Sequence, residues 1–147
     1  MTRRERLLVL VLRLAGVMSG LAIVAVVMPR AWMAACHDWL GLGALPDGAI
    51  VEYLARSLSA FYAMFGGLCI LVSFDIRRHA GVVTYLGVTH VAFAAVVLAV
   101  DLSAGLPWYW TAAEVPPAML FGVAILALQA GGRDPTPPAP GPGQKTR

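Results

Sequence analysis

Residues 58–74, LSAFYAMFGGLCILVSF, contain no charged side chain. With the preceding residues they form an apolar run from Ala49 to Phe74. At a rise of about 1.5 Å per residue, about 20 helical residues cross the ~30 Å hydrocarbon core of a bilayer. The run is continuously apolar and does not alternate, so a helix is favoured over a barrel strand. It therefore predicts a transmembrane helix.

Three further apolar runs lie at residues 7–28, 81–102 and 113–130. The last run is the shortest, and we expect its helix to extend over residues 112–114 at its start. Apolar residues make up 59% of the 147-residue chain and charged residues only 13%, about half the share usual in a soluble domain. Mean hydropathy is +0.76. We predict an all-α integral membrane protein, an antiparallel four-helix bundle formed by a single domain over residues 1–130.

The basic residues indicate an orientation. Of eleven Lys and Arg residues, Arg13 and Arg56 lie inside apolar runs and Arg30 follows the first run. The remaining eight lie in the N-terminal segment, between the second and third runs, or in the tail. The positive-inside rule then predicts both termini in the cytoplasm, as in a bacterial inner-membrane protein. Such a distribution marks the lipid bilayer, and not nucleic acid, as the partner. The Pro- and Gly-rich residues 131–147 are predicted to be a disordered cytoplasmic tail.

The two predicted outer loops carry all four tryptophans. Ala31–Leu42, AWMAACHDWLGL, contains two of them, and residues 107–110 read PWYW. Tryptophan and tyrosine favour the headgroup layer because an apolar ring lies there with its polar group hydrated. We expect Ala31–Leu42 to form a short interfacial helix or a re-entrant turn.

A cleaved signal sequence is the competing interpretation of the N-terminus. MTRRER precedes an apolar stretch, and Met33–Cys36 faintly resembles a lipoprotein cleavage box. Arg13 interrupts the stretch, however, and Pro29-Arg30 separates it from the cysteine. The stretch also exceeds the 7–15 residues of a signal core. A retained helix is favoured.

Small and polar residues share one face of each predicted helix. In lipid, helices associate through close packing and interhelical hydrogen bonds, so such faces indicate interfaces. We therefore expect them to point inward in the bundle. They comprise Arg13, Gly16 and Gly20 in the first run; Glu52, Arg56, Ser59, Ala63, Gly66, Ile70 and Ser73 in the second; Gly87, His90, Ala94 and Asp101 in the third; and Glu114, Ala118 and Gly122 in the fourth.

Four charged side chains fall at one depth near the outer boundary. A charged side chain near the centre of the bilayer costs at least about 2.5–3.5 kcal/mol. Each of these four charges therefore calls for a structural or a functional explanation. One interpretation is a structural ion-pair network, built on an ordinary i,i+4 pair. The other is an outward-facing cation or substrate site whose surplus carboxylates can carry a proton. The layer comprises Glu52, Arg56, Asp101 and Glu114, with His37 and Asp38 of the first outer loop within reach.

His90 lies near the middle of the third run. Haem would need a second axial ligand at that depth, but His37 and His79 lie at opposite membrane faces, and Met64 is the only remote candidate. We expect no cofactor, and a neutral His90 hydrogen-bonded to Ser59, Tyr62 or Thr89.

The remaining polar groups do not indicate a catalytic or metal-binding site. Arg13 is expected to extend toward the cytoplasmic headgroups, or to pair with Asp75. Cys36 and Cys69 lie in a loop and a helix, so neither a disulfide nor a metal cluster is expected. The nucleophile, zinc and phosphate-binding motifs of common enzyme classes are absent, which favours a non-enzymatic protein.

Residues 45–57 (LPDGAIVEYLARS), Ser73-Phe74-Asp75 with Arg77-Arg78, and Asp101 with Gly105-Leu106-Pro107 resemble small bacterial four-helix membrane proteins, loosely similar to the DoxX-like group. This resemblance implies the four-helix topology, and through DoxX itself an association with a quinone-linked oxidoreductase.

Three functions remain open at this point: an accessory subunit or homo-oligomeric bundle, a proton- or cation-coupled carrier, and a redox accessory with His90 near a quinone. A carrier predicts a cavity that reaches His90 from the outer layer. A structural bundle predicts tight packing there and a satisfied Arg56.

Overall fold

The computed structural model describes residues 1–131, and the predicted tail beyond them lies outside the described residues. Over those residues the chain is helical, with no strand. Its elements are α1 (Arg3–Gly20), α2 (Ile23–Val27), α3 (Arg30–Trp39), α4 (Ala49–Ser73), α5 (Ala80–Ala104) and α6 (Trp108–Ala130). A single turn separates α1 from α2, so together they make one span. The prediction of an all-helical protein with four helices able to cross a membrane is confirmed.

Local sequence accounts for the helix ends. Thr2 caps α1: its hydroxyl accepts from the Glu5 N–H, and the Glu5 carboxylate accepts from the Thr2 N–H at 2.7 Å. Helix α6 begins at Trp108 and not at residue 113 as expected. Its N-cap is Pro107, whose missing N–H costs nothing at a helix start. The aromatic segment after Pro107 is thus the first turn of the helix, although its composition resembles a loop.

Glycines hold the helices together in two pairs, α1 with α4 and α5 with α6. A Cβ built on Gly16 would lie 2.8 Å from the Gly66 carbonyl oxygen, and one on Gly122 would lie 2.9 Å from the Gly87 carbonyl oxygen. Backbones can approach this closely only where no side chain intervenes. The small faces predicted to form interfaces therefore do so within each pair.

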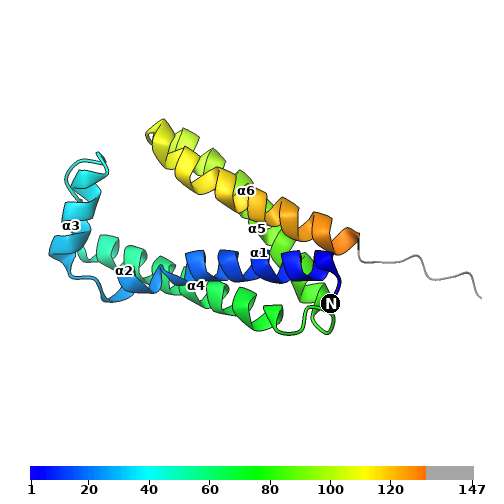
Figure 1. Cartoon of the computed structure of the whole chain (residues 1–147). Helices are drawn as coiled ribbons and strands as arrows, with labels where there is room; N and C mark the ends of the chain where they lie inside the picture. Colours follow the sequence, from blue (N-terminus) through cyan, green and yellow to red (C-terminus); the bar gives the residue numbers. More distant parts are fainter. Residues whose placement is uncertain (132–147) are drawn as a thin grey trace, which may run out of the picture.

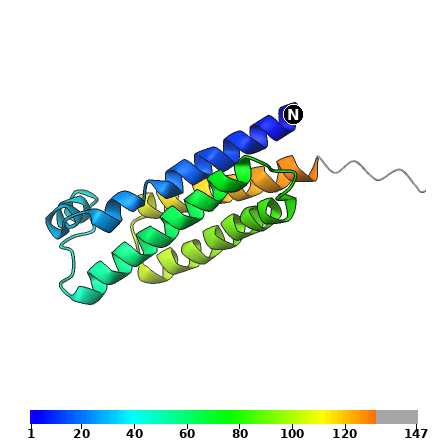
Figure 2. The same ribbon diagram turned by 90° about the horizontal axis from the view of Figure 1, so that it is seen from below.

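The two pairs join at the end that carries the N-terminus (Figure 2). The buried apolar core lies there and consists of Leu8, Leu12, Cys69, Val72, Val83, Leu86 and Ile125. Polar contacts reinforce this end: Arg77 Nε donates to Glu5 Oε1 at 2.7 Å, and Arg4 Nη1 donates to the Gly131 carbonyl at 2.7 Å. This bond, which the Arg77 guanidinium donates to the Glu5 carboxylate, raises the pKa of Arg77 above its usual value.

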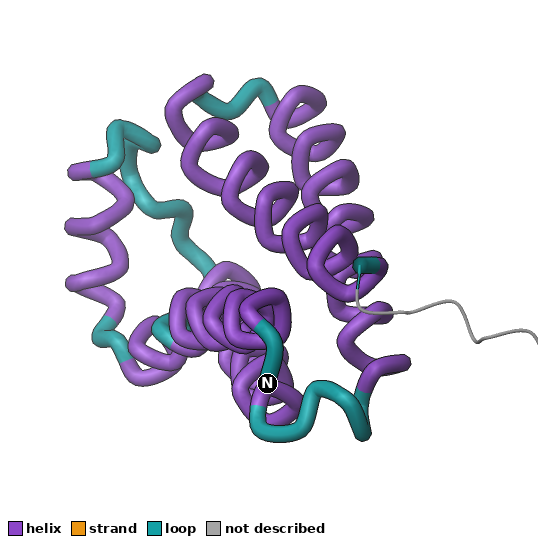
Figure 3. Tube along the Cα trace, turned by 45° about the vertical axis from the view of Figure 1, so that its right-hand side comes forward, coloured by secondary structure: helices purple, strands orange, loops and turns teal. Residues whose placement is uncertain are grey.

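The pairs diverge toward the other end, where α4 and α5 contact each other little (Figures 1 and 3). Helix α3 lies beyond the end of α2 and is turned across it (Figure 1). One hydrogen bond links it to the second pair, from the Tyr109 hydroxyl to the Leu40 carbonyl at 2.7 Å. The bundle is therefore closed at one end and splayed at the other.

Candidate functional site

A cleft of about 700 Å³ occupies the space between the two diverging helix pairs. All four spans contribute to its wall. Most of the wall is apolar, and the aromatic rings that line it are Phe61, Tyr62, Phe65, Tyr85, Phe93 and Phe121. Its ionisable side chains include His90 on α5 and Glu114 on the first part of α6. A cavity lined by His90 is one feature that the carrier interpretation predicts, and that interpretation stays a prediction.

His90 is buried on α5 between two rings, with centroid distances of 5.1 Å to Phe65 and 6.3 Å to Phe121. Its Nδ1 lies 2.7 Å from the Leu86 carbonyl oxygen. The expected bond to Ser59, Tyr62 or Thr89 was wrong, because the carbonyl one turn earlier on the same helix is nearer. A carbonyl only accepts, so Nδ1 carries the proton and Nε2 of the neutral ring is an acceptor.

Glu114 is half-buried on the first part of α6 and forms part of the cleft wall. Tyr62 of α4 lines the same cleft, and Trp110 lies one turn earlier than Glu114 on α6. Asp101 lies on the last turn of α5, the helix that pairs with α6. Asp101 is only 3% exposed, and its Oδ2 has no hydrogen-bond partner among the described residues.

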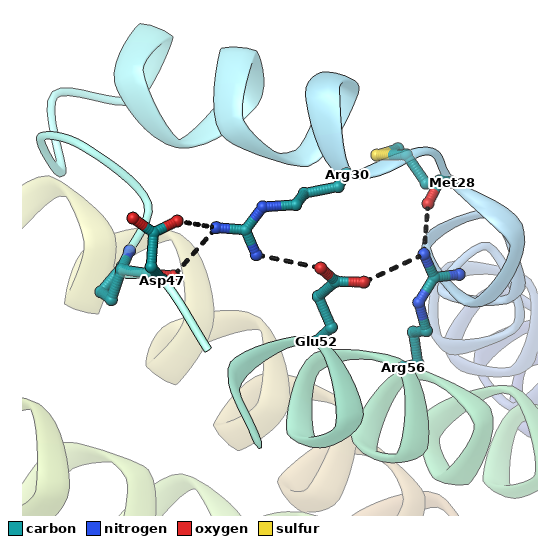
Figure 4. Close-up of polar contacts among 6 residues, drawn as sticks. Met28, Arg30, Asp47, Glu52 and Arg56 are labelled. Carbon is teal, nitrogen blue, oxygen red and sulfur yellow. Dashed lines mark hydrogen bonds and ion pairs between the residues drawn. The ribbon is translucent and has the colours of Figure 1, made fainter. Parts of the chain in front are cut away.

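A separate ion-pair network ties α3 to α4 (Figure 4). Arg30 at the start of α3 donates from Nη2 to Asp47 Oδ1 at 2.6 Å and from Nη1 to Glu52 Oε1 at 3.0 Å. The second Glu52 oxygen lies 3.8 Å from Arg56 Nη2. The bond to Glu52 raises the pKa of Arg30 above its usual value, against the opposing effect of desolvation.

Arg56 also reaches the end of α2. It donates to the Val26 carbonyl at 2.5 Å and to the Met28 carbonyl at 3.0 Å (Figure 4). Carbonyls at a helix C-terminus lack partners within the helix, and here a guanidinium from α4 supplies them. Arg56 is therefore satisfied, as the structural interpretation required.

The single charged layer expected from the sequence is divided in two. Glu52 and Arg56 lie with Arg30 and Asp47 on the first helix pair, whereas Asp101 and Glu114 lie on the second. Depth alone placed them together, but the pairs diverge at that depth. Sequence reasoning also missed Arg30 and Asp47 as members. The available signal was that Arg30 is the one basic residue left on the side with few basic residues.

Helix α3 does not bring its polar residues to the cleft. His37 Nδ1 on α3 contacts the Gly43 carbonyl of the segment that follows the helix at 2.7 Å, and Asp38 is exposed. His37 lines a second, smaller cleft of about 340 Å³ under α3, with Glu52 and Trp110. The cysteines are free, Cys36 exposed and Cys69 buried.

Arg13 is held at the closed end. Its Nε donates to Ser73 Oγ at 3.2 Å, and its guanidinium lies 5.4 Å from the centre of the Phe74 ring. The alternative pairing with Asp75 was wrong, because Asp75 Oδ1 accepts instead from the Arg78 N–H at 3.0 Å.

Nothing described supports a metal or haem site. Over residues 1–131 no three His, Cys, Asp or Glu residues are grouped as metal ligands would be. Met64, the remote candidate for a second haem ligand, is 73% exposed, while His90 is buried. No protein-family model, curated protein or solved structure matches the chain.

Proposed function

We propose that this is a multi-pass protein of the bacterial inner membrane that binds a lipophilic organic cation in the cleft between its helix pairs. Glu114 is the charge partner of that cation. One observation carries the proposal: the cleft presents an acid and other hydrogen-bond acceptors in an aromatic wall, and no lysine or arginine is among the described residues that line it.

The distribution of guanidinium groups supports a positive ligand. Arg30 and Arg56 are engaged by Glu52, Asp47 and the carbonyls that end α2. Asp101 and Glu114 are in none of the ion pairs formed by the described residues. A carboxylate in a low-dielectric site needs a counter-charge, which a cationic ligand would supply.

The neutral polar groups of the cleft support the same ligand. His90 Nε2 is an acceptor, and the Thr89 hydroxyl is already donating to the Leu86 carbonyl at 3.0 Å. These groups favour an occupant with N–H donors or positive charge. A quinone, the ligand implied by the DoxX-like resemblance, has carbonyls that only accept, and the Ser19 and Tyr85 hydroxyls in the wall are donors for such a group. That resemblance and the redox role stay predictions.

Size and aromatic lining support a bulky apolar cation. Pockets of about 300–1,000 Å³ accommodate drug-sized molecules, and the cleft falls in this range. Rings within about 6 Å of a cation attract it by about 0.5–2 kcal/mol each, more as water is excluded. Phe65 and Phe121 lie against His90, and Phe93 packs edge-on against Tyr62 in the same wall.

The positive-inside rule orients the site. Arg3, Arg4, Arg6, Arg77 and Arg78 gather at the closed end, which we assign to the cytoplasm. The cleft then widens toward the outer leaflet. We assign α3 to the outer headgroup layer, where its exposed Trp32 and Trp39 would lie. Bound molecules would enter from that layer.

Binding of tetraphenylphosphonium to the purified protein in detergent, measured by equilibrium dialysis, tests the proposal. We expect saturable binding that Glu114→Gln weakens at least tenfold. Asp75→Asn, which removes an acid at the closed end but keeps its hydrogen-bond acceptor, should leave affinity unchanged. The isosteric anion tetraphenylborate should not compete. Equal binding of cation and anion, or an unaffected Glu114→Gln variant, would refute the assignment.

A further inference from the structure

Two consecutive prolines, Pro116 and Pro117, lie inside α6. A proline has no backbone N–H, so the carbonyl four residues earlier loses its helical hydrogen-bond donor, and the proline ring presses on that carbonyl and bends the helix. Pro116 removes the donor of the Ala112 carbonyl, and Pro117 removes the donor of the Ala113 carbonyl. Two backbone acceptors on the early turns of α6 therefore lack their ordinary partners.

Of these two acceptors, the Ala113 carbonyl belongs to the cleft wall. Ala113 and Pro117 both line the cleft, whereas Ala112 and Pro116 are not among the described residues that line it. A helical C=O points toward the residue four positions later, so the Ala113 carbonyl lies on the helix surface between two residues of the wall. Over residues 1–131 no side-chain hydrogen bond to a backbone carbonyl ends on it.

A carbonyl without a donor is costly in lipid, and prolines within membrane spans are tolerated where another group supplies the missing donor. The next residue along α6 is Glu114, which also lines the cleft and is in none of the ion pairs formed by the described residues. A carbonyl and a carboxylate only accept hydrogen bonds. The two neighbouring groups therefore call for an occupant that donates hydrogen bonds and is positively charged.

We propose that the cation held in the cleft is a protonated primary or secondary amine, with one N–H donated to the Glu114 carboxylate and another to the Ala113 carbonyl. This rests on the proposed function and narrows its ligand from lipophilic cations in general to lipophilic amines. A phosphonium or quaternary ammonium ion brings the charge but no N–H, so it pairs with Glu114 and leaves the carbonyl without a donor.

The rest of α6 gives the amine an orientation. Phe121 is seven residues beyond Glu114, which is two helical turns along the same face, and it lines the cleft as well. Its ring lies 6.3 Å from the His90 ring, centre to centre. The ammonium group is therefore held at Ala113 and Glu114, and the apolar body of the ligand extends along α6 to the rings around His90.

Equilibrium dialysis of two cations that differ only at nitrogen tests the N–H requirement. Dibenzylammonium has two N–H groups, and dibenzyldimethylammonium has none. We expect the wild type to bind dibenzylammonium about tenfold or more tightly, the change that one hydrogen bond to a charged group produces. Pro117→Ala restores the N–H that the Ala113 carbonyl lacks, so the preference should fall to about threefold or less. Pro116→Ala, the matched control outside the cleft wall, should keep the wild-type preference.

A carbonyl resonance tests the contact independently of affinity. Ala113-Glu114 is the one Ala-Glu step in the sequence, so isotopic labelling of alanine carbonyl carbons and glutamate nitrogens gives a single correlated signal in nuclear magnetic resonance. Saturating dibenzylammonium should move the Ala113 carbonyl signal downfield, the direction of a gained hydrogen bond, and dibenzyldimethylammonium should not. In Pro117→Ala the signal should already lie downfield without ligand, because the helical hydrogen bond is restored.

The outcomes separate this inference from the proposed function. Equal affinity of the wild type for the two cations, or a preference that Pro117→Ala leaves intact, would overturn the amine assignment, while binding that depends on Glu114 would keep the proposed function. An Ala113 carbonyl signal that does not respond to bound dibenzylammonium would overturn the contact. Absence of binding by both cations would overturn the proposed function and the amine assignment with it.

Discussion

Gly66 of α4 lies directly against the backbone of α1 at Gly16: a Cβ on Gly66 would come within 2.5 Å of the Gly16 carbonyl oxygen and 2.6 Å of the Gly20 nitrogen. Neither neighbour is a flexible side-chain end, so neither can yield without a shift of the helix. The close crossing of α1 and α4 therefore requires glycine at position 66, because glycine has no Cβ.

Gly66→Ala should loosen that pair. Overpacking of a close interface typically costs about 1–3 kcal/mol, and we expect this loss in the free energy of unfolding measured in detergent. Gly67→Ala is the matched control, since nothing lies within 4 Å of a Cβ there and alanine is the better helix former. Equal stability of the two variants would contradict this account of the interface.

Arg30→Gln should release α3 and leave the spans intact. It removes the bonds to Glu52, which is partly exposed, and to Asp47, which is fully exposed, so each bond by itself adds little to the stability of the fold. Amide hydrogen exchange over residues 30–39 should speed up, while exchange within α4 and α5 stays unchanged. Asp47→Asn should have a smaller effect, because Glu52 still holds Arg30. Unchanged exchange in α3 after Arg30→Gln would show that the network does not position it.

Tyr62→Phe should weaken cation binding but keep the fold. Tyr62 and Glu114 line the same cleft, and a typical hydrogen bond contributes about 0.5–1.5 kcal/mol. We expect tetraphenylphosphonium affinity to fall by about three- to tenfold. Tyr53→Phe, at an exposed position outside the cleft, should bind as the wild type does. If both variants bind normally, Tyr62 does not orient Glu114.

Ser73→Ala should destabilise the closed end. Ser73 is 3% exposed and accepts from Arg13 Nε, so its removal leaves that guanidinium held by the Phe74 ring alone. We expect a loss of about 0.5–1.5 kcal/mol in unfolding free energy, the usual value of one hydrogen bond. Ser57→Ala, whose exposed hydroxyl bonds only within its own helix, should cost less. A larger loss from Ser57→Ala would contradict the assignment.

Cys36 reports the orientation. It is exposed on α3, whereas Cys69 is fully buried. A membrane-impermeant maleimide should label Cys36 in intact spheroplasts, and Cys36→Ser should abolish the signal. Labelling that appears only after the membrane is permeabilised would place α3 in the cytoplasm and reverse the topology.

Part of the candidate site was predictable and part was not. His90, Asp101 and Glu114 stand out in the sequence because a charge or an imidazole within an apolar run is costly and needs a partner. The roles of Tyr62 and Asp47 were not predictable, because a tyrosine in an apolar run or a charge in a loop is ordinary, and the one signal for Arg30 was its place among few basic residues. Sequence depth also grouped Glu52 with Glu114, although they lie on different helix pairs.

The sequence by itself determined the four spans and the faces on which they pack, because both depend on local properties: the length of an apolar run and the spacing of glycines along one helix. Only the tertiary structure decided that the helices pair two by two and diverge, since that depends on how the Gly16–Gly66 and Gly87–Gly122 contacts set the crossings. The divergence opens the cleft, and in the described residues Arg56 binds the carbonyls at the end of α2 while Asp101 Oδ2 is buried without a hydrogen-bond partner. Residues at the same depth meet only if their helices do, and helix direction is a property of the whole assembly.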